Sequence, residues 1–169
     1  MPSLHELERT ASKRDLLLRL QVQPRGPLTT LRVGVARRCQ ADAPERSNGL
    51  MLLGELKGWA LPTTGGLRLD TMRVQGDRSA GVGPLIWAAT FAWALEATPC
   101  RSATLLAIRD NDAQHKRLVR YFRRLGFSAI RELESGVLDL GPRLIWGGAG
   151  LLMRGDCAEG LAKASRQLG

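Results

Sequence analysis

Residues 69–86 read LDTMRVQGDRSAGVGPLI and place a glycine-containing loop between a predicted strand and a predicted apolar helix. The strand is predicted over residues 67–74 and the helix over residues 84–97, with Pro84 at its first position, where a missing N–H costs nothing. Glycine allows sharp turns and lets main-chain N–H groups face a ligand. Because the positive end of the helix dipole follows and Arg78 adds a charge, the loop suits a phosphate or pyrophosphate.

The same glycines have a second interpretation, a tight turn that only permits close packing. Two other phosphate-binding motifs are excluded by single residues. A dinucleotide fingerprint requires a third glycine where the chain has Ile86, and a P-loop requires Gly-Lys-Ser or Gly-Lys-Thr, which the chain lacks. The motif that remains is Arg78, two residues, Gly81, one residue and Gly83.

The segments around the loop predict one α+β domain over residues 1–169. Upstream we expect a helix or arm in residues 1–14, with the helix over residues 3–13, a strand after Asp15, a turn at residues 24–27, and strands over residues 31–37 and 50–56. Downstream we expect a strand over residues 102–108, a helix over residues 112–125, strands over residues 127–133 and 144–154, and a loosely attached tail over residues 155–169.

Composition and charge limit the classes of function. The longest apolar stretch, residues 84–95, is shorter than the roughly 20 residues that cross a bilayer, so no membrane partner is expected. The N-terminus lacks the apolar core of a secretory signal, which favours a cytoplasmic protein. The three cysteines form no CxxC pair, so we expect no metal site and a reducing compartment. The net charge of +9 attracts anions, namely a phosphorylated cofactor, an acidic substrate or nucleic acid. Aromatic residues do not interleave with a basic run, so nucleic acid has no motif in its support.

Two motifs together resemble the GCN5-related N-acetyltransferase (GNAT) family. The family's coenzyme A loop reads Gln or Arg, two residues, Gly, one residue, and Gly or Ala, as residues 78–83 do here. Its helix-ending segment, an aromatic residue, three residues and Gly-Phe, is similar to residues 122–127, and a buried strand separates the two segments. The resemblance covers residues 67–133 well and the final two predicted strands less closely. It implies a mixed sheet splayed between its fourth and fifth strands, with acetyl-CoA as acyl donor, an amine acceptor, direct transfer and no metal.

The resemblance also implies which residues hold acetyl-CoA. Main-chain groups at the end of the strand would hold the pantetheine arm, loop amides would hold the pyrophosphate, and an asparagine after the next strand would contact the pantetheine. The corresponding residues are Met72, Arg73 and Val74 for the strand, Arg78, Ser79, Ala80, Gly81, Val82 and Gly83 for the loop, and Asn111.

The catalytic positions depart from the family pattern. A tyrosine acid is usual four residues before the helix-ending glycine, where this chain has Phe122. The neighbouring Tyr121 would serve only in a rotated or irregular helix, because one residue turns a helix by about 100°; the alternative is a tyrosine at the helix edge with a solvated hydroxyl. His115 is a candidate general base, or a residue that caps or solvates the first helical turn. Asp70, the only acid in its strand, is a second candidate base, or pairs with Arg68 or Arg73.

The N-terminal half is shorter than in the family, which places one or two helices between its first two strands. Residues 22–28 leave room only for a turn. Either the first strand is missing and residues 3–20 supply a helix, or the acceptor site is open and admits a large acceptor such as a protein N-terminus or lysine. Because Phe122 replaces the usual acid, a second possible function is an acyl-CoA-binding regulatory module with little activity. The net charge alone supports a third function, a nucleic-acid-binding protein. A homodimer is compatible with the sequence.

Overall fold

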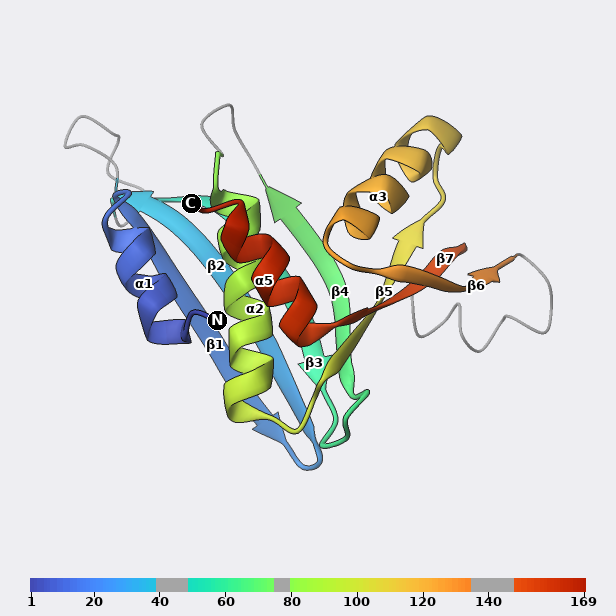
Figure 1. Ribbon diagram of the computed structural model, residues 1–169, viewed down its shortest axis with the longest axis horizontal. Helices are drawn as coiled ribbons and strands as arrows, with labels where there is room; N and C mark the ends of the chain where they lie inside the picture. The colour runs from blue at the N-terminus through green and yellow to red at the C-terminus, as the bar shows by residue number, and fades with distance from the viewer. Residues whose placement is uncertain (39–48, 75–79, 135–147) are drawn as a thin grey trace.

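The computed structural model describes residues 1–38, 49–74, 80–134 and 148–169, which form a mixed α+β domain around one seven-stranded sheet (Figure 1). The strand order is β1-β2-β3-β4-β5-β7-β6, with β4 and β5 parallel and the other neighbours antiparallel. In chain order the elements are α1 (Leu4–Ser12), β1 (Leu16–Arg25), β2 (Leu28–Arg38), β3 (Leu50–Ala60), β4 (Leu67–Val74), α2 (Val82–Ala97), β5 (Ser102–Ile108), α3 (Asp112–Arg124), β6 (Ser128–Leu133), β7 (Gly150–Asp156) and α5 (Cys157–Arg166).

Helix α2 is the centre of the hydrophobic core. Nearly all of its residues from Val82 to Ala94 are buried, because the sheet lies behind the helix and α1 and α5 lie beside it (Figure 1). The helix begins two residues earlier than the sequence predicts, so Pro84 is its third residue and not its first. The proline is still harmless, because the first four N–H groups of a helix have no partner within it.

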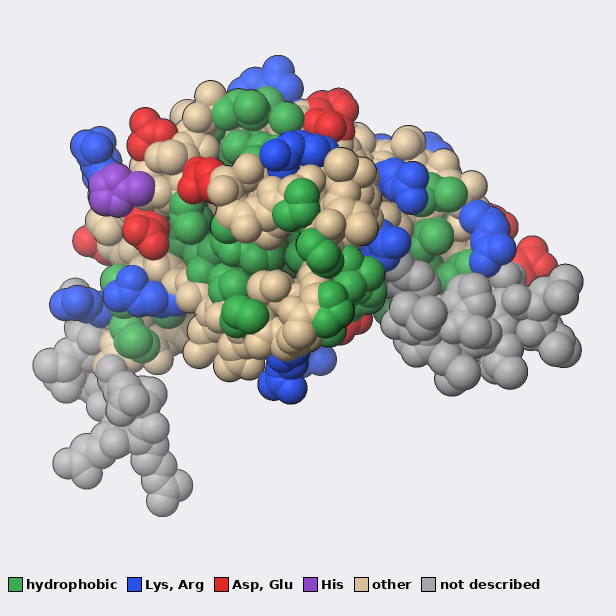
Figure 2. Space-filling model, turned by 90° about the horizontal axis from the view of Figure 1, so that it is seen from below, with side chains coloured by type: hydrophobic (Ala, Val, Ile, Leu, Met, Phe, Trp, Pro, Cys, Tyr) green, Lys and Arg blue, Asp and Glu red, His purple; other side chains and the backbone are tan. Residues whose placement is uncertain are grey.

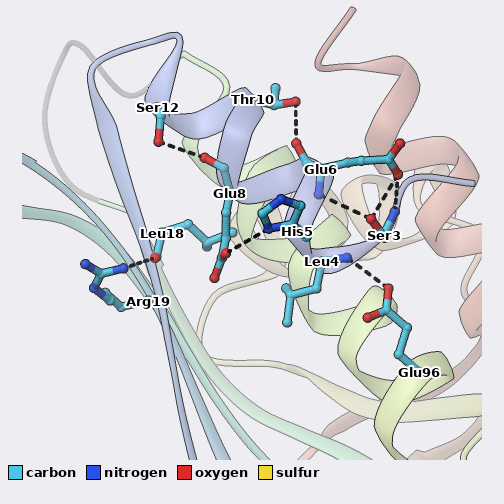
Figure 3. Close-up of polar contacts among 10 residues, drawn as sticks. All are labelled: Ser3, Leu4, His5, Glu6, Glu8, Thr10, Ser12, Leu18, Arg19 and Glu96. Carbon is cyan, nitrogen blue, oxygen red and sulfur yellow. Dashed lines mark hydrogen bonds and ion pairs between the residues drawn. The ribbon is translucent and has the colours of Figure 1, made fainter.

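Helix α1 is fixed at its N-terminus by a capping box (Figure 3). The Ser3 hydroxyl accepts a hydrogen bond from the Glu6 amide at 3.2 Å, and the Glu6 carboxylate accepts one from the Ser3 amide at 2.7 Å. The Leu4 amide then donates to Glu96 near the end of α2 at 2.8 Å, while Leu7 and Ala11 are buried. These contacts hold α1 against α2.

The first strand is present, which decides between the two alternatives for the N-terminal half. Strand β1 pairs with β2 along its whole length, and only the turn at Gly26 and Pro27 joins them. Helix α1 precedes β1, so no helix follows it before β2. The face of β1–β4 opposite α2 carries exposed or half-buried side chains, which fits the open alternative.

The C-terminal segment was expected to be loosely attached, and the structure corrects this expectation. Residues Cys157, Leu161 and Ala164 of α5 are buried, and a Cβ atom on Gly160 would lie 2.6 Å from the Phe91 ring. Such a short distance shows that α5 packs directly on α2. The predicted strand over residues 144–154 begins at Gly150 in the described part of the chain; residues 135–147 lie outside it.

The end of the molecule formed by the β1–β2 and β3–β4 turns is apolar in its middle. Seen from below, hydrophobic side chains gather there, and lysine and arginine side chains lie mostly towards the edges (Figure 2). None of the described helices is long and apolar enough to cross a membrane.

Close packing at Gly160 predicts a stability cost for any larger side chain there. Gly160→Val should lower the free energy of unfolding by about 1–3 kcal/mol, because the Phe91 ring is buried and must move. Urea denaturation followed by circular dichroism measures the change. Ala162→Val, at a half-buried position of the same helix, is the control and should cost less than about 1 kcal/mol. Equal, small effects of both variants would show that α5 is not tightly packed.

Candidate functional site

The site begins where β4 and β5 separate. Their parallel pairing covers only Leu67 with Ala103, Arg68 with Thr104, and Leu69 with Leu105. Both strands continue beyond this point and diverge towards their C-terminal ends (Figure 1). The predicted splay between the fourth and fifth strands is therefore confirmed.

A β-bulge in β4 coincides with the separation. Lys57 of β3 pairs with Thr71 and Gly58 pairs with Leu69, so Asp70 has no partner on β3. A bulge bends its strand and increases the local twist. Residues 70–74 accordingly turn away from β5, and their main-chain groups on that side have no ladder partner among the described strands.

A cavity of about 520 Å³ lies between the separated ends of β4 and β5. The end of β4, the start of α2, the end of β5 and one side of α3 line it, through residues that include Met72, Val74, Gly83, Leu118, Tyr121 and Phe122. The lining is mostly apolar with a few polar groups, and the volume is in the range of small-molecule sites. Three residues predicted to contact the cofactor, Met72, Val74 and Gly83, thus meet at one cavity.

The N-terminus of α2 faces this cavity without a side-chain cap. Gly81 occupies the N-cap position with φ 82°, a left-handed conformation that favours glycine. Gly83 is buried, and a Cβ atom there would lie 3.6 Å from both Met72 Cε and the Tyr121 hydroxyl. The free N–H groups and the helix dipole suit an anion. Arg78 and Ser79 lie outside the described residues, and their contacts stay predictions.

Tyr121 lines the cavity. Phe122, and not Tyr121, stands at the position where the GNAT resemblance would place the tyrosine acid. The Trp87 indole N–H donates a hydrogen bond to the Tyr121 hydroxyl oxygen at 2.8 Å. The oxygen is therefore held in place while its own proton remains available to a ligand. Burial raises the pKa of Tyr121, and the hydrogen bond from Trp87 opposes this rise in part. The solvated-hydroxyl alternative is thus not what the structure shows.

Tyr121 needs no irregular helix, because the cavity is wide enough to contact two successive residues of α3. Phe122 is 8% exposed and packs against the Trp87 and Phe127 rings, with centroid distances of 6.1 and 6.0 Å. Its ring closes the inner wall of the cavity. Gly126 ends the helix with φ 97°, as the sequence predicts.

The structure does not bring Asn111 and His115 to the cavity lining. The Asn111 side chain caps α3, accepting hydrogen bonds from the amides of Ala113 at 2.9 Å and Gln114 at 3.3 Å. The His115 Nδ1 atom lies 3.2 Å from the Ile108 carbonyl oxygen, and the ring lines a separate hollow of α3. A contact of Asn111 with pantetheine and a role of His115 as base stay predictions.

Asp70 is the acidic residue in the cavity lining, and it has no partner within the described part of the chain. The expected pairing with Arg68 is not found, since Arg68 instead donates to the Gly65 carbonyl at 2.8 Å and the Thr104 hydroxyl at 3.0 Å. No described ion pair joins Asp70 to Arg73 either. Asp70 lines the cavity and also a second hollow on the other face of the sheet. No cluster of three or more possible metal ligands occurs among the described residues.

No family model matches the chain, and no curated protein matches it. Among solved structures, the crystal structure of a nourseothricin acetyltransferase is similar over 85% of each chain, with 17% identity and a TM-score of 0.49.

The environment of Tyr121 predicts a measurable shift in its ionisation. The chain has one tyrosine, so absorbance of tyrosinate during alkaline titration reports Tyr121 alone. Its pKa should exceed the ordinary value of about 10 in the folded protein and return to it in urea. Trp87→Phe should raise the pKa further, because the lost N–H donor favoured the ionised form. An unshifted pKa in the folded protein would contradict the burial of the hydroxyl.

Proposed function

We propose that the protein is an acetyl-CoA-dependent N-acetyltransferase that transfers acetyl directly to an amine. The observation that carries the proposal is the cavity at the separation of β4 and β5, with unpaired strand groups on one side and an uncapped helix N-terminus on another. A long, partly apolar ligand with amide groups and a phosphorylated end matches these features. Acetyl-CoA has this chemistry, and its thioester supplies the acetyl group.

The end of β4 would bind the pantetheine arm. Main-chain groups of Met72, Arg73 and Val74 lie beyond the last β4–β5 pair and can form strand-like hydrogen bonds with the amides of an extended ligand. A main-chain N–H in this segment would also polarise the thioester carbonyl. The start of α2, together with residues 78–81, would hold the pyrophosphate.

Tyr121 is the proposed general acid. Its hydroxyl oxygen is occupied by the Trp87 N–H, and its raised pKa keeps it protonated at neutral pH. When the amine nitrogen bonds to the carbonyl carbon and the carbon–sulfur bond breaks, the sulfur needs a proton. Tyr121 can supply this proton from the cavity wall. The acceptor is an amine, with a protein N-terminus or a lysine among the candidates.

Phe122 motivates a second candidate function, an acyl-CoA-binding regulatory module with little activity. In this case the cavity would bind the same ligand, and Tyr121 would only line it. Release of free thiol in step with formation of an acetylated amine would exclude the module. Mass spectrometry of cell extract incubated with labelled acetyl-CoA, with and without the protein, would find the acceptor.

The cavity predicts saturable binding of acetyl-CoA, measured by isothermal calorimetry. Gly83→Val should weaken binding tenfold or more, because the side chain would enter the space between Met72 and Tyr121 at the helix N-terminus. Gly65→Ala, in the β3–β4 turn, is the control and should bind as the unchanged protein does. Absence of binding at millimolar acetyl-CoA, with circular dichroism showing a folded protein, would refute the proposed function.

The assignment of Tyr121 predicts a specific loss of rate. Tyr121→Phe should lower kcat about a hundredfold or more, in the range for a lost general acid, with acetyl-CoA affinity changed less than twofold. Thiol release in a stopped assay measures kcat, and calorimetry measures affinity. An unchanged kcat would remove Tyr121 from the chemistry. The same assay on His115→Gln tests the predicted base.

A further inference from the structure

The face of the sheet opposite α2 carries an excess of basic side chains. Paired residues of neighbouring strands point to the same face, and one such row consists of Gln21, Arg32, Lys57 and Thr71 across β1–β4. The rows beside it add further polar groups. The basic residues of these rows are Arg19, Arg32, Lys57, Arg68, Arg73 and Arg154, and the carboxylates are Glu55 and, at the bulge, Asp70.

A hollow of about 410 Å³ lies in the middle of this face. Its lining includes Gln21, Arg32, Lys57, Trp59 and Asp70. Asp70 also lines the cavity proposed for acetyl-CoA, so this residue borders both spaces. An acceptor whose amine lies at Asp70 would therefore be next to the cavity proposed for acetyl-CoA.

The basic side of the hollow presents cations and not the carboxylate. Arg32 and Lys57 lie 2.7 and 3.7 Å from the Glu55 carboxylate, but both cations are 51% exposed and Glu55 is 17% exposed. The hydrogen bond from Arg32 holds the pKa of Glu55 below its usual value, so Glu55 stays ionised. Arg32, Lys57 and Glu55 together therefore carry one net positive charge. A ligand that enters the hollow meets the guanidinium and the ammonium first.

The other side of the hollow presents the Asp70 carboxylate, which has no partner among the described residues. Neighbouring strands are about 4.8 Å apart, so Lys57 lies about 5 Å and Arg32 about 10 Å along the row from Thr71, next to Asp70. The hollow thus has a negative end at the cavity and a positive end over β2 and β3. A polycation would match only one of these two ends.

We propose that the acceptor is a small amine that also carries a carboxylate. This inference rests on the proposed function and narrows its acceptor. The ammonium binds at Asp70, the anionic group binds Lys57 and Arg32, and the half-buried Trp59 provides an apolar surface for the carbon chain. Asp70 takes one proton from the ammonium, and the freed nitrogen bonds to the acetyl carbon. The carbon–sulfur bond breaks and the sulfur receives a proton from Tyr121. The nitrogen then loses its second proton to solvent, and solvent returns a proton to Tyr121.

The experiment compares acceptors that differ only in charge. Thiol release is measured with glycine, 4-aminobutanoate and 6-aminohexanoate, with the neutral 4-aminobutanamide and butylamine, with the polycation spermidine, and with peptides whose second and third residues are acidic. At least one amino acid should exceed 4-aminobutanamide tenfold or more in kcat/KM. Saturation-transfer NMR without acetyl-CoA should show the same amino acid bound.

Variants test whether the named residues cause this preference. Lys57→Gln and Arg32→Gln should each raise KM for the preferred amino acid fivefold or more and leave the neutral amide unchanged. Asp70→Asn should weaken both classes of acceptor and lower kcat. Arg9→Gln, on α1, makes the same change in net charge away from the hollow and is the matched control.

Each other outcome overturns the inference. A preference for neutral amines or spermidine would show that the positive end does not bind the acceptor. Acetylation of acidic peptides without any amino acid would make a protein N-terminus the acceptor instead. Acetyl-CoA binding without turnover of any amine would favour the regulatory module. Absence of acetyl-CoA binding in calorimetry is a separate result, which refutes the proposed function itself.

Discussion

The bulge at Asp70 is the constraint on which the rest of the site depends. It ends the β4–β5 ladder at Leu69 and leaves the following main chain unpaired. Gly58 permits the bulge, since a Cβ atom there would lie 2.5 Å from the Arg68 carbonyl oxygen. Gly54 lets α2 begin close to β3, since its Cβ atom would lie 2.9 Å from Ile86 Cδ1. Two glycines of β3 therefore permit the close packing of two elements that line the cavity, β4 and the start of α2.

The second requirement is a fixed helix N-terminus. An anion site of main-chain N–H groups is useful only if the helix cannot shift, and α2 is held by the sheet, α1 and α5. The sheet covers one side, α1 is attached through the bond from Leu4 to Glu96, and α5 packs at Gly160. Arg14, after α1, also donates to the Leu168 carbonyl and joins both ends of the chain beside Gly81. The peripheral helices thus support the site without lining it.

Local sequence patterns were enough to predict most helices and strands. The geometry of the site depends on contacts between segments that are distant in the sequence. The strands at residues 67–74 and 102–108 and the helix end at Gly126 were predicted correctly, because length, apolar content and glycine chemistry are local signals. The bulge is a property of the register between β3 and β4, which one strand's sequence does not contain. The position of Tyr121 depends on Trp87, 34 residues earlier, and α5 depends on the fit of Gly160 to Phe91.

Because of the bulge, Asp70 lies next to spaces on both faces of the sheet. Lys57 pairs with Thr71 on the bare face, while Met72 pairs with Leu56 on the helix side and lines the cavity. Asp70 lies at the step between these registers and lines both spaces. In the proposed function, an acyl donor in the cavity and an acceptor in the hollow would both lie next to Asp70. Basic residues outnumber carboxylates on the bare face, so this face would attract an anionic acceptor towards Asp70.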